Sequence, residues 1–217
     1  MAGSVRLDLA IRSAQAASRV VGRVAAGWVG RRDTALLARL SPRVRLLEVC
    51  MPMVSRSADH LLMWWGCAAV MAVSGNRRAA GAGVAAMLPA AVVANLVGKR
   101  LVRRSRPPLV MRIARPGRVP ESGAFPSGHT AAAAAFATAA VLVSRAAGVP
   151  VCGAAVLVAY SRLYTRAHYP ADVAAGTVIG IGTALILHRL TGSLAADGRQ
   201  FPKAVRHASA PRCRVAE

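Results

Sequence analysis

The chain has 217 residues, which is enough for one domain or at most two. Its composition is 55% hydrophobic and only 17% charged, with a mean hydropathy of +0.42, whereas soluble domains contain about 45–50% apolar residues. The formal net charge of +21 favours anionic partners, but such an apolar chain is not typical of a soluble nucleic-acid-binding protein. We therefore expect a membrane protein that contacts anionic lipids and a phosphorylated substrate, and no nucleic acid.

Residues 1–59 form a basic amphipathic segment in which arginine recurs among alanine, valine and leucine. Pro42 and Pro52 interrupt its second half. This pattern predicts helices that lie at the membrane interface. A spanning helix over residues 10–30 is an alternative, although the three arginines in that stretch would be costly at the centre of a bilayer.

Residues 60–190 contain five apolar segments and are expected to form one membrane-embedded domain. The segment from Ala79 to Gly98 has twenty residues without a charge, which is long enough to span a bilayer. Trp64 and Trp65 are predicted to lie at the membrane interface. The predicted fold class is all-α, a multi-pass transmembrane helical bundle of five or six spans, in the cell membrane. The five segments are residues 60–74, 79–98, 130–143, 149–160 and 171–187.

The basic tail over residues 191–217 is predicted to be disordered. Between the apolar segments, the turns over residues 75–78 and 144–149 are short, whereas residues 99–127 and 161–170 form longer or more polar connections. If each apolar segment crosses the membrane once, both longer connections lie at the same face. The unusual polar residues all fall in these two connections, so we expect one site at that face.

The first polar cluster supplies positive charge. Lys99 closes an apolar segment and is one of only two lysines among the 29 basic residues. A proline follows Arg106 and biases that residue away from helix, so the chain can fold back and bring Lys99 and Arg106 around one anion. Arg162 offers a third cation for phosphate oxygens. The alternative is that these residues face the membrane surface, and this interpretation is preferred for Arg103 and Arg104.

The second cluster, Pro126-Ser127-Gly128-His129, opens an alanine-rich apolar segment. Ser127 is a candidate N-cap, and a helix N-terminus attracts anions through its free N–H groups. Gly128 would let a ligand approach the backbone closely. The alternative is a capped helix start that carries a neutral histidine and has no ligand.

The third cluster joins His168 to Asp172 across a predicted helix start, with Pro170 at the first helical position. We predict that Asp172 accepts a hydrogen bond from the His168 imidazole, which leaves the other nitrogen free to attack phosphorus. The alternative is a carboxylate that only stabilises the helix dipole. His129 would then protonate the departing alkoxide, and water would hydrolyse the phospho-histidine.

A metal site is not expected. The eight acidic residues include only one, Asp172, in the three clusters, whereas a two-metal phosphatase needs several converging carboxylates. The four cysteines show no C-x-x-C spacing, and a cysteine metal cluster is equally unexpected. The sequence predicts no cofactor.

These clusters resemble the signature of the type 2 phosphatidic acid phosphatase and vanadium haloperoxidase superfamily, which reads K-x6-RP, PSGH and SR-x5-H-x3-D. The match covers residues 60–190, and residues 57–65 further resemble the phosphatase half of proteins with a downstream lipid-kinase domain, which is not expected here. The resemblance implies a helical bundle with a site at one membrane face. It implies phosphate binding by Lys99, Arg106, Ser127, Gly128 and Arg162, with His129 as acid, His168 as nucleophile and Asp172 as its orienting group.

Two other functions are considered. A vanadate-dependent haloperoxidase could use the same pocket, but those relatives are soluble, whereas this chain has apolar segments of membrane length. A basic membrane scaffold without enzymatic activity would not need His168. Phosphatidic acid, a polyprenyl phosphate or pyrophosphate and a phosphorylated polyprenyl sugar all remain possible substrates. The basic residues favour a cytoplasmic site, whereas the family often faces outward, so the side and the oligomeric state are left open.

Overall fold

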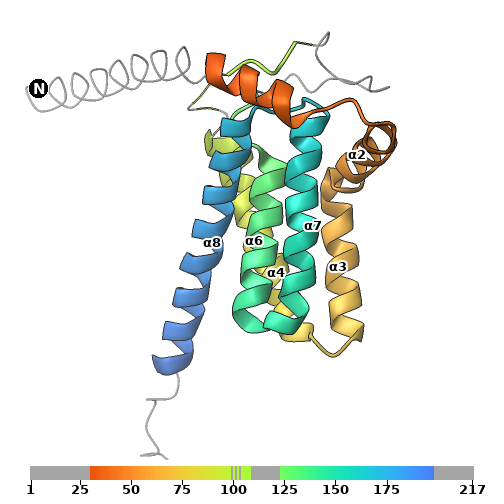
Figure 1. Ribbon diagram of the computed structural model, residues 1–217. Coiled ribbons are helices and arrows are strands. Elements are labelled where there is room, and N and C mark those ends of the chain that lie inside the picture. Colours follow the sequence, from red (N-terminus) through yellow and green to blue (C-terminus); the bar gives the residue numbers. More distant parts are fainter. Residues whose placement is uncertain (1–29, 99, 101, 103, 109–122, 198–217) are drawn as a thin grey trace, which may run out of the picture.

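The computed structural model describes residues 30–98, 100, 102, 104–108 and 123–197. In this part of the chain every regular element is a helix, and the predicted all-α bundle is confirmed (Figure 1). A first helix covers residues 30–40. It is followed by α2 (Arg45–Ser57), η1 (Asp59–Leu61), α3 (Leu62–Val73), α4 (Arg77–Val92), η2 (Val93–Gly98), α6 (Gly128–Val143), α7 (Arg145–Tyr164) and α8 (Pro170–Asp197).

Helix α6 lies at the centre of the bundle and contacts α4, α7 and α8 (Figure 1). Its alanines are largely buried, and such small side chains let neighbouring helices approach closely. Helix α8 approaches most closely at two glycines. A Cβ atom at Gly176 would lie 2.5 Å from the carbonyl oxygen of Ser127, and one at Gly180 would overlap the carbonyl oxygen of Ala131.

A core between α3, α4, α6 and α7 contains Trp64, whose ring centroid lies 5.5 Å from that of Phe136. Trp64 is fully buried, so its predicted place at the membrane interface is wrong. Trp65 points the other way and is 47% exposed. Neighbouring residues on a helix are about 100° apart, so only one of the two can face the core.

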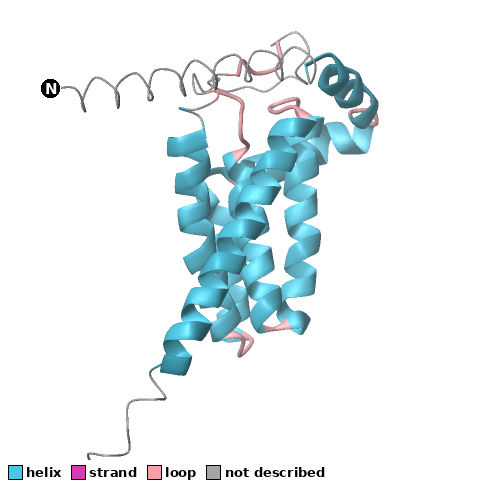
Figure 2. Cartoon of the chain, turned by 90° about the vertical axis from the view of Figure 1, so that its left-hand side faces the viewer, coloured by secondary structure: helices cyan, strands magenta, loops and turns pink. Residues whose placement is uncertain are grey.

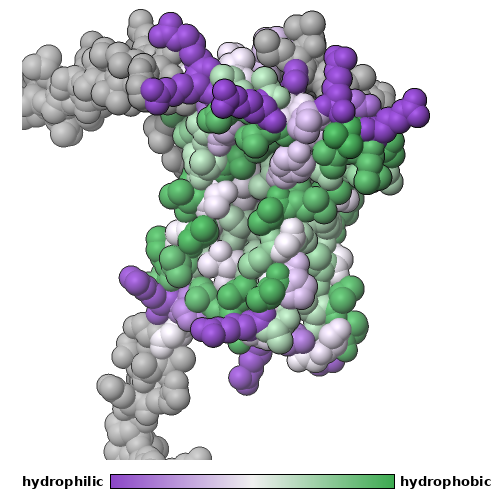
Figure 3. All heavy atoms as spheres, in the orientation of Figure 1, coloured by the Kyte–Doolittle hydropathy of each residue, from purple (hydrophilic) through white to green (hydrophobic). Residues whose placement is uncertain are grey.

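All five predicted apolar segments are helical. Three helical stretches, Arg77–Leu96, Arg145–Tyr164 and Pro170–Gly192, are long and apolar enough to cross a membrane, and Asp59–Val73 and Gly128–Val143 are shorter apolar helices. Large apolar side chains such as Val73 and Val178 are exposed on the outside of the bundle. Figure 3 shows this apolar band between polar ends, which is the surface expected of a membrane protein. The alternative span over residues 10–30 lies outside the described residues.

Loops and turns gather at the two ends of the bundle (Figure 2). The two short turns meet at one end, where Ser144 Oγ lies 3.3 Å from Asn76 Oδ1. The two longer connections meet at the other end, where Arg106 Nη1 donates to the carbonyl oxygen of Ala167 over 3.1 Å. The predicted alternation of short and long connections is therefore confirmed for the described residues.

The helix boundaries differ from the prediction, most clearly in α7 and α8. Helix α7 begins at Arg145, so residues 145–149, which were predicted to form a turn, are helical. Helix α7 continues to Tyr164, so Arg162 lies on its last turn and not in a loop. Helix α8 continues to Asp197, so residues 191–197 are helical although they were predicted to belong to a disordered tail. The rest of that tail lies outside the described residues. A run of small and apolar residues without proline explains why the helix does not stop at the first polar side chain.

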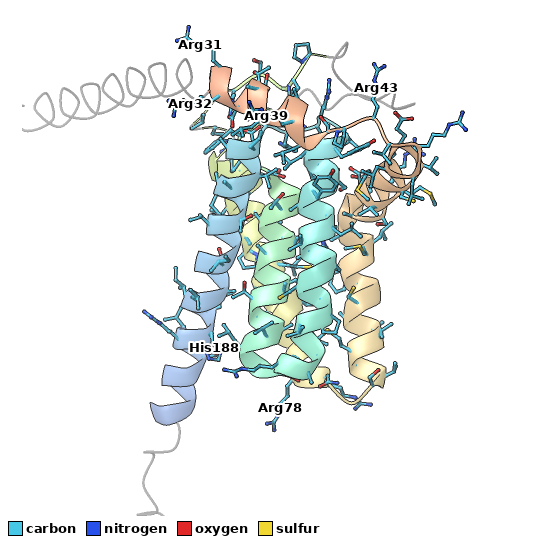
Figure 4. The ribbon with its side chains drawn as sticks, in the orientation of Figure 1. Arg31, Arg32, Arg39, Arg43, Arg78 and His188 are labelled. Carbon is cyan, nitrogen blue, oxygen red and sulfur yellow. The ribbon has the colours of Figure 1, made fainter. Side chains whose placement is uncertain are left out.

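The N-terminal helices lie across the end of the bundle that holds the longer connections (Figure 1). Arg31, Arg32, Arg39 and Arg43 lie at this end, and Arg78 and His188 lie at the opposite end (Figure 4). Pro42 lies between the helix over residues 30–40 and α2, as its predicted interruption of the segment requires. Pro52 was predicted to interrupt the segment as well, but it lies inside α2. Helices are present over residues 30–40 and 45–57 as predicted, and their position at a membrane interface stays a prediction.

Candidate active site

His168 lies just before α8 and is 2% exposed. Its Nδ1 lies 2.7 Å from the carbonyl oxygen of Ala124. A carbonyl only accepts, so Nδ1 carries the proton and Nε2 presents its lone pair. Nη1 of Arg106 lies 3.4 Å from this Nε2. Burial, followed by the charges of Arg162 and Arg106, holds the pKa of His168 well below its usual value, and the ring is therefore neutral and nucleophilic.

The predicted hydrogen bond from His168 to Asp172 is absent. Nδ1 of His168 and Oδ2 of Asp172 lie 3.9 Å apart, which is ion-pair distance only. Oδ2 instead accepts the backbone N–H of Tyr169 over 2.8 Å, and Oδ1 accepts from Arg104 over 2.9 Å. The physical reason is that the carbonyl of Ala124 has taken the imidazole N–H.

Arg104 is part of the site, so its interpretation as a membrane-facing residue is wrong. Its Nη2 lies 2.7 Å from Oδ2 of Asp33, which comes from the helix over residues 30–40, and its Nη1 bonds Asp172. The guanidinium also lies 4.3 Å from the ring centroid of Tyr169. The position of Arg104 in the sequence does not distinguish it from the neighbouring arginines. The only available signal was that the chain has just eight acidic residues, so each of them is a candidate partner for an arginine.

The second histidine, His129, has a carboxylate partner that sequence reasoning missed. Its Nε2 lies 3.0 Å from Oδ1 of Asp59, and Nη1 of Arg162 lies 3.8 Å from the same oxygen. Asp59 thus joins the predicted acid to a predicted phosphate ligand. Ser55 anchors the arginine, because Nη1 of Arg162 donates to its Oγ over 2.6 Å and to its carbonyl oxygen over 3.3 Å.

The start of α6 confirms the predicted cap. Oγ of Ser127 accepts from the backbone N–H of Thr130 over 3.4 Å and from its hydroxyl over 2.9 Å. The N–H of Ser127 donates to the carbonyl oxygen of Asp172 over 3.0 Å, which joins the second cluster to the third. Gly128 has a packing reason to lack a side chain, because a Cβ there would lie 2.7 Å from Nδ2 of Asn95.

The structure therefore gathers most of the predicted site at one end of the bundle. Lys99 lies outside the described residues, and its role stays a prediction. In the part of the chain that is described, no three histidine, cysteine or acidic side chains are grouped to hold a metal ion, and metal independence also stays a prediction. The predicted residues found together are Arg106, Ser127, Gly128, His129, Arg162, His168 and Asp172.

This arrangement suits transfer of a phosphoryl group. The neutral imidazole of His168 presents a lone pair beside Arg106. The imidazole of His129 and the guanidinium of Arg162 both contact Asp59. The N-terminus of α6, which begins at Gly128, adds the positive end of a helix dipole. Catalysis of phosphoryl transfer consists mostly of positioning and charge stabilisation, and groups of these kinds provide both.

Comparison with known proteins also supports phosphoryl transfer. The sequence matches the PAP2 superfamily over residues 78–194. A decaprenylphosphoryl-5-phosphoribose phosphatase of Mycobacterium tuberculosis (strain CDC 1551 / Oshkosh) is 34% identical over 150 residues, which cover 64% of this chain and 77% of the relative. The protein of the same name in strain H37Rv matches equally.

Two crystal structures share the fold. One is the first transmembrane PAP2-type phosphatidylglycerolphosphate phosphatase from Bacillus subtilis, with a TM-score of 0.60 and 18% identity over 82% of this chain and 96% of that protein. The other is Aquifex aeolicus LpxE, with a TM-score of 0.57 and 22% identity over 70% of this chain and 92% of that protein.

Proposed function

This chain belongs to the PAP2 superfamily, and we propose that it is a lipid phosphate phosphatase that works through a phospho-histidine intermediate without a metal ion. It is a membrane protein and a hydrolase of phosphoric esters. The single observation that carries the proposed mechanism is the buried Nε2 of His168, which lies 3.4 Å from the guanidinium of Arg106. If Arg106 holds the phosphate of the substrate, the lone pair of His168 Nε2 lies beside that phosphate and can attack phosphorus.

The reaction divides into two displacements. In the first, Nε2 of His168 attacks phosphorus, the bond from phosphorus to the lipid oxygen breaks, and His129 donates its proton to that oxygen. In the second, His129 accepts a proton from water, the water oxygen attacks phosphorus, and the P–N bond breaks. Inorganic phosphate leaves, and both imidazoles return to their starting state. Lys99, Arg106, Arg162 and the start of α6 at Ser127 and Gly128 hold the phosphate oxygens.

The proposed substrate is a phosphomonoester on a lipid-linked sugar. The support is the 34% identity to a decaprenylphosphoryl-5-phosphoribose phosphatase. Phosphatidic acid and phosphatidylglycerol phosphate carry the same phosphomonoester, whereas polyprenyl pyrophosphate carries a terminal phosphoryl group on a phosphoanhydride. The proposed site suits the terminal phosphoryl group that all of them share. The position of the site at the end of a membrane bundle suits a phosphate at the bilayer surface, with the acyl or prenyl chain in the lipid.

The test is phosphate release from a panel of these four lipids by the full chain purified in detergent. His168→Ala is the inactive variant, and His188→Ala is its matched control, because that histidine lies at the opposite end of the bundle (Figure 4). We expect activity with the wild type and with His188→Ala, no activity with His168→Ala, and no effect of EDTA. Undiminished turnover by His168→Ala would refute the nucleophile, and loss of activity in EDTA would refute the metal-free mechanism.

A further inference from the structure

A chain of buried charges runs from the N-terminal helix to the active site. Asp33 lies 2.7 Å from Arg104, and Arg104 lies 2.9 Å from Asp172. The three side chains are 5%, 12% and 0% exposed, so water screens these charges only weakly. Arg104 therefore bridges two carboxylates that are far apart in the sequence.

Asp33 also holds the start of α8. Its second oxygen, Oδ1, accepts the backbone N–H of Ala171 over 3.1 Å. The first N–H groups of a helix have no partner within the helix, and a carboxylate at that position is favoured by the helix dipole. Asp33 thereby fixes the turn that connects His168 to Asp172.

The charges of this chain matter for the attack of His168 on phosphorus. Arg104 alone would neutralise Asp172, whose Oδ2 lies 3.9 Å from Nδ1 of His168. With Asp33 included, the three groups keep one net negative charge. The imidazole is neutral before attack and becomes positive as its bond to phosphorus forms. A negative charge nearby therefore stabilises the transition state more than the bound substrate.

We propose that Asp33 and Arg104 are positioning residues of this phosphatase, which hold Asp172 in place and keep a net negative charge beside His168. The proposal rests on the proposed function. It assigns a role to the helix over residues 30–40. That helix lies outside the part of the chain that matches the family, which begins at residue 78. Neither residue belongs to the sequence signature that identified the site.

The test compares kcat and KM of the full chain, purified in detergent, for Asp33→Asn, Asp33→Glu, Arg104→Gln and the double variant Asp33→Asn/Arg104→Gln. The matched control is Glu48→Gln, which removes a carboxylate from an exposed position of α2 in the same N-terminal segment. We expect Asp33→Asn to lower kcat about tenfold with KM within about twofold, Asp33→Glu to recover part of the loss, and Glu48→Gln to match the wild type. Arg104→Gln should lower kcat because Asp172 loses its anchor, although the net charge beside His168 becomes more negative. The double variant, in which Asp172 alone keeps one net negative charge, should lose no more than Arg104→Gln alone, because residues that act as one unit are not additive.

Wild-type kcat in folded Asp33→Asn, an effect on KM alone, or additive losses in the double variant would overturn the proposal. If Asp33→Asn does not fold, Arg104→Lys answers the same question, because it keeps the charge but cannot bridge two carboxylates as a fork does. It should lower kcat with KM preserved, and full kcat would overturn the proposal. An inactive wild type or an active His168→Ala would instead refute the proposed function, so the two failures are distinguishable.

Discussion

Nδ1 of His168 donates a hydrogen bond of 2.7 Å to the carbonyl oxygen of Ala124. A backbone carbonyl cannot take up a proton at neutral pH, so this contact fixes the tautomer without becoming part of the proton transfer. Because Nδ1 of His168 is bonded to this carbonyl, Oδ2 of Asp172 lies 3.9 Å from Nδ1 and does not accept its proton. In the proposed mechanism Asp172 acts on the imidazole through charge and through the turn that it stabilises, and a hydrogen bond to the ring is not needed for either effect.

The low pKa of His168 predicts a pH profile. In the proposed mechanism the neutral ring of His168 attacks, so acid should abolish activity by protonating it, and a pKa below the usual 6.5 moves this loss to lower pH. Arg106 is one of the charges that lower the pKa. We therefore expect the acidic limb of kcat/KM to move to higher pH in Arg106→Gln and to stay in place in Arg106→Lys. Comparing variants on one substrate cancels the ionisation of the substrate. A limb that does not move in Arg106→Gln would contradict the assignment.

Asp59 is expected to assist His129 as the acid. Because Oδ1 of Asp59 lies 3.0 Å from Nε2 of His129, Asp59→Asn should misorient the ring and lower kcat about tenfold with a lipid substrate, which is part of the usual contribution of a general acid. p-Nitrophenyl phosphate has a leaving group that needs no proton, so its first displacement should be nearly unaffected in a rapid-mixing burst. Equal losses with both substrates would show that Asp59 acts on something other than leaving-group protonation.

Ser55 is expected to affect substrate binding. Its hydroxyl accepts from Nη1 of Arg162 over 2.6 Å, and loss of a partner for a buried charged group costs about 1–3 kcal/mol. Ser55→Ala should therefore raise KM several-fold, whereas Ser57→Ala, an exposed serine two positions further along α2, should not. Steady-state kinetics with one lipid phosphate measures both. An unchanged KM in Ser55→Ala would mean that other contacts hold Arg162 sufficiently.

Packing of α8 on α6 provides a test of the fold. A Cβ atom at Gly180 would overlap the carbonyl oxygen of Ala131, whereas nothing lies within 4 Å of a Cβ at Gly182. Gly180→Ala should cost about 1–3 kcal/mol through overpacking, and Gly182→Ala should be neutral or stabilising by up to about 1 kcal/mol. Thermal unfolding in detergent measures the difference. Equal Tm values would contradict this helix contact.

The helical bundle and the meeting of the site segments were predictable, because both follow from hydropathy and from the alternation of connection lengths. The start of α8 at Pro170 was also predictable, since proline favours the first helical position. The roles of Asp33 and Asp59 were not predictable. Both carboxylates reach the site through contacts between segments far apart in the sequence, and no local motif marks such contacts. The partner of His168 was not predictable either, since it is a backbone carbonyl, which no side-chain motif records.

The most direct test of the mechanism is to trap phosphate on His168. The leaving group of p-nitrophenyl phosphate needs no acid, so His129→Ala should form the phospho-enzyme but hydrolyse it slowly, because the same residue activates water in the second displacement. Rapid quenching in alkali, which preserves phospho-histidine, followed by mass spectrometry of the peptides should place one phosphate on His168. A His129→Ala enzyme that turns over p-nitrophenyl phosphate with no phosphate on that residue, or with phosphate on another side chain, would contradict the account.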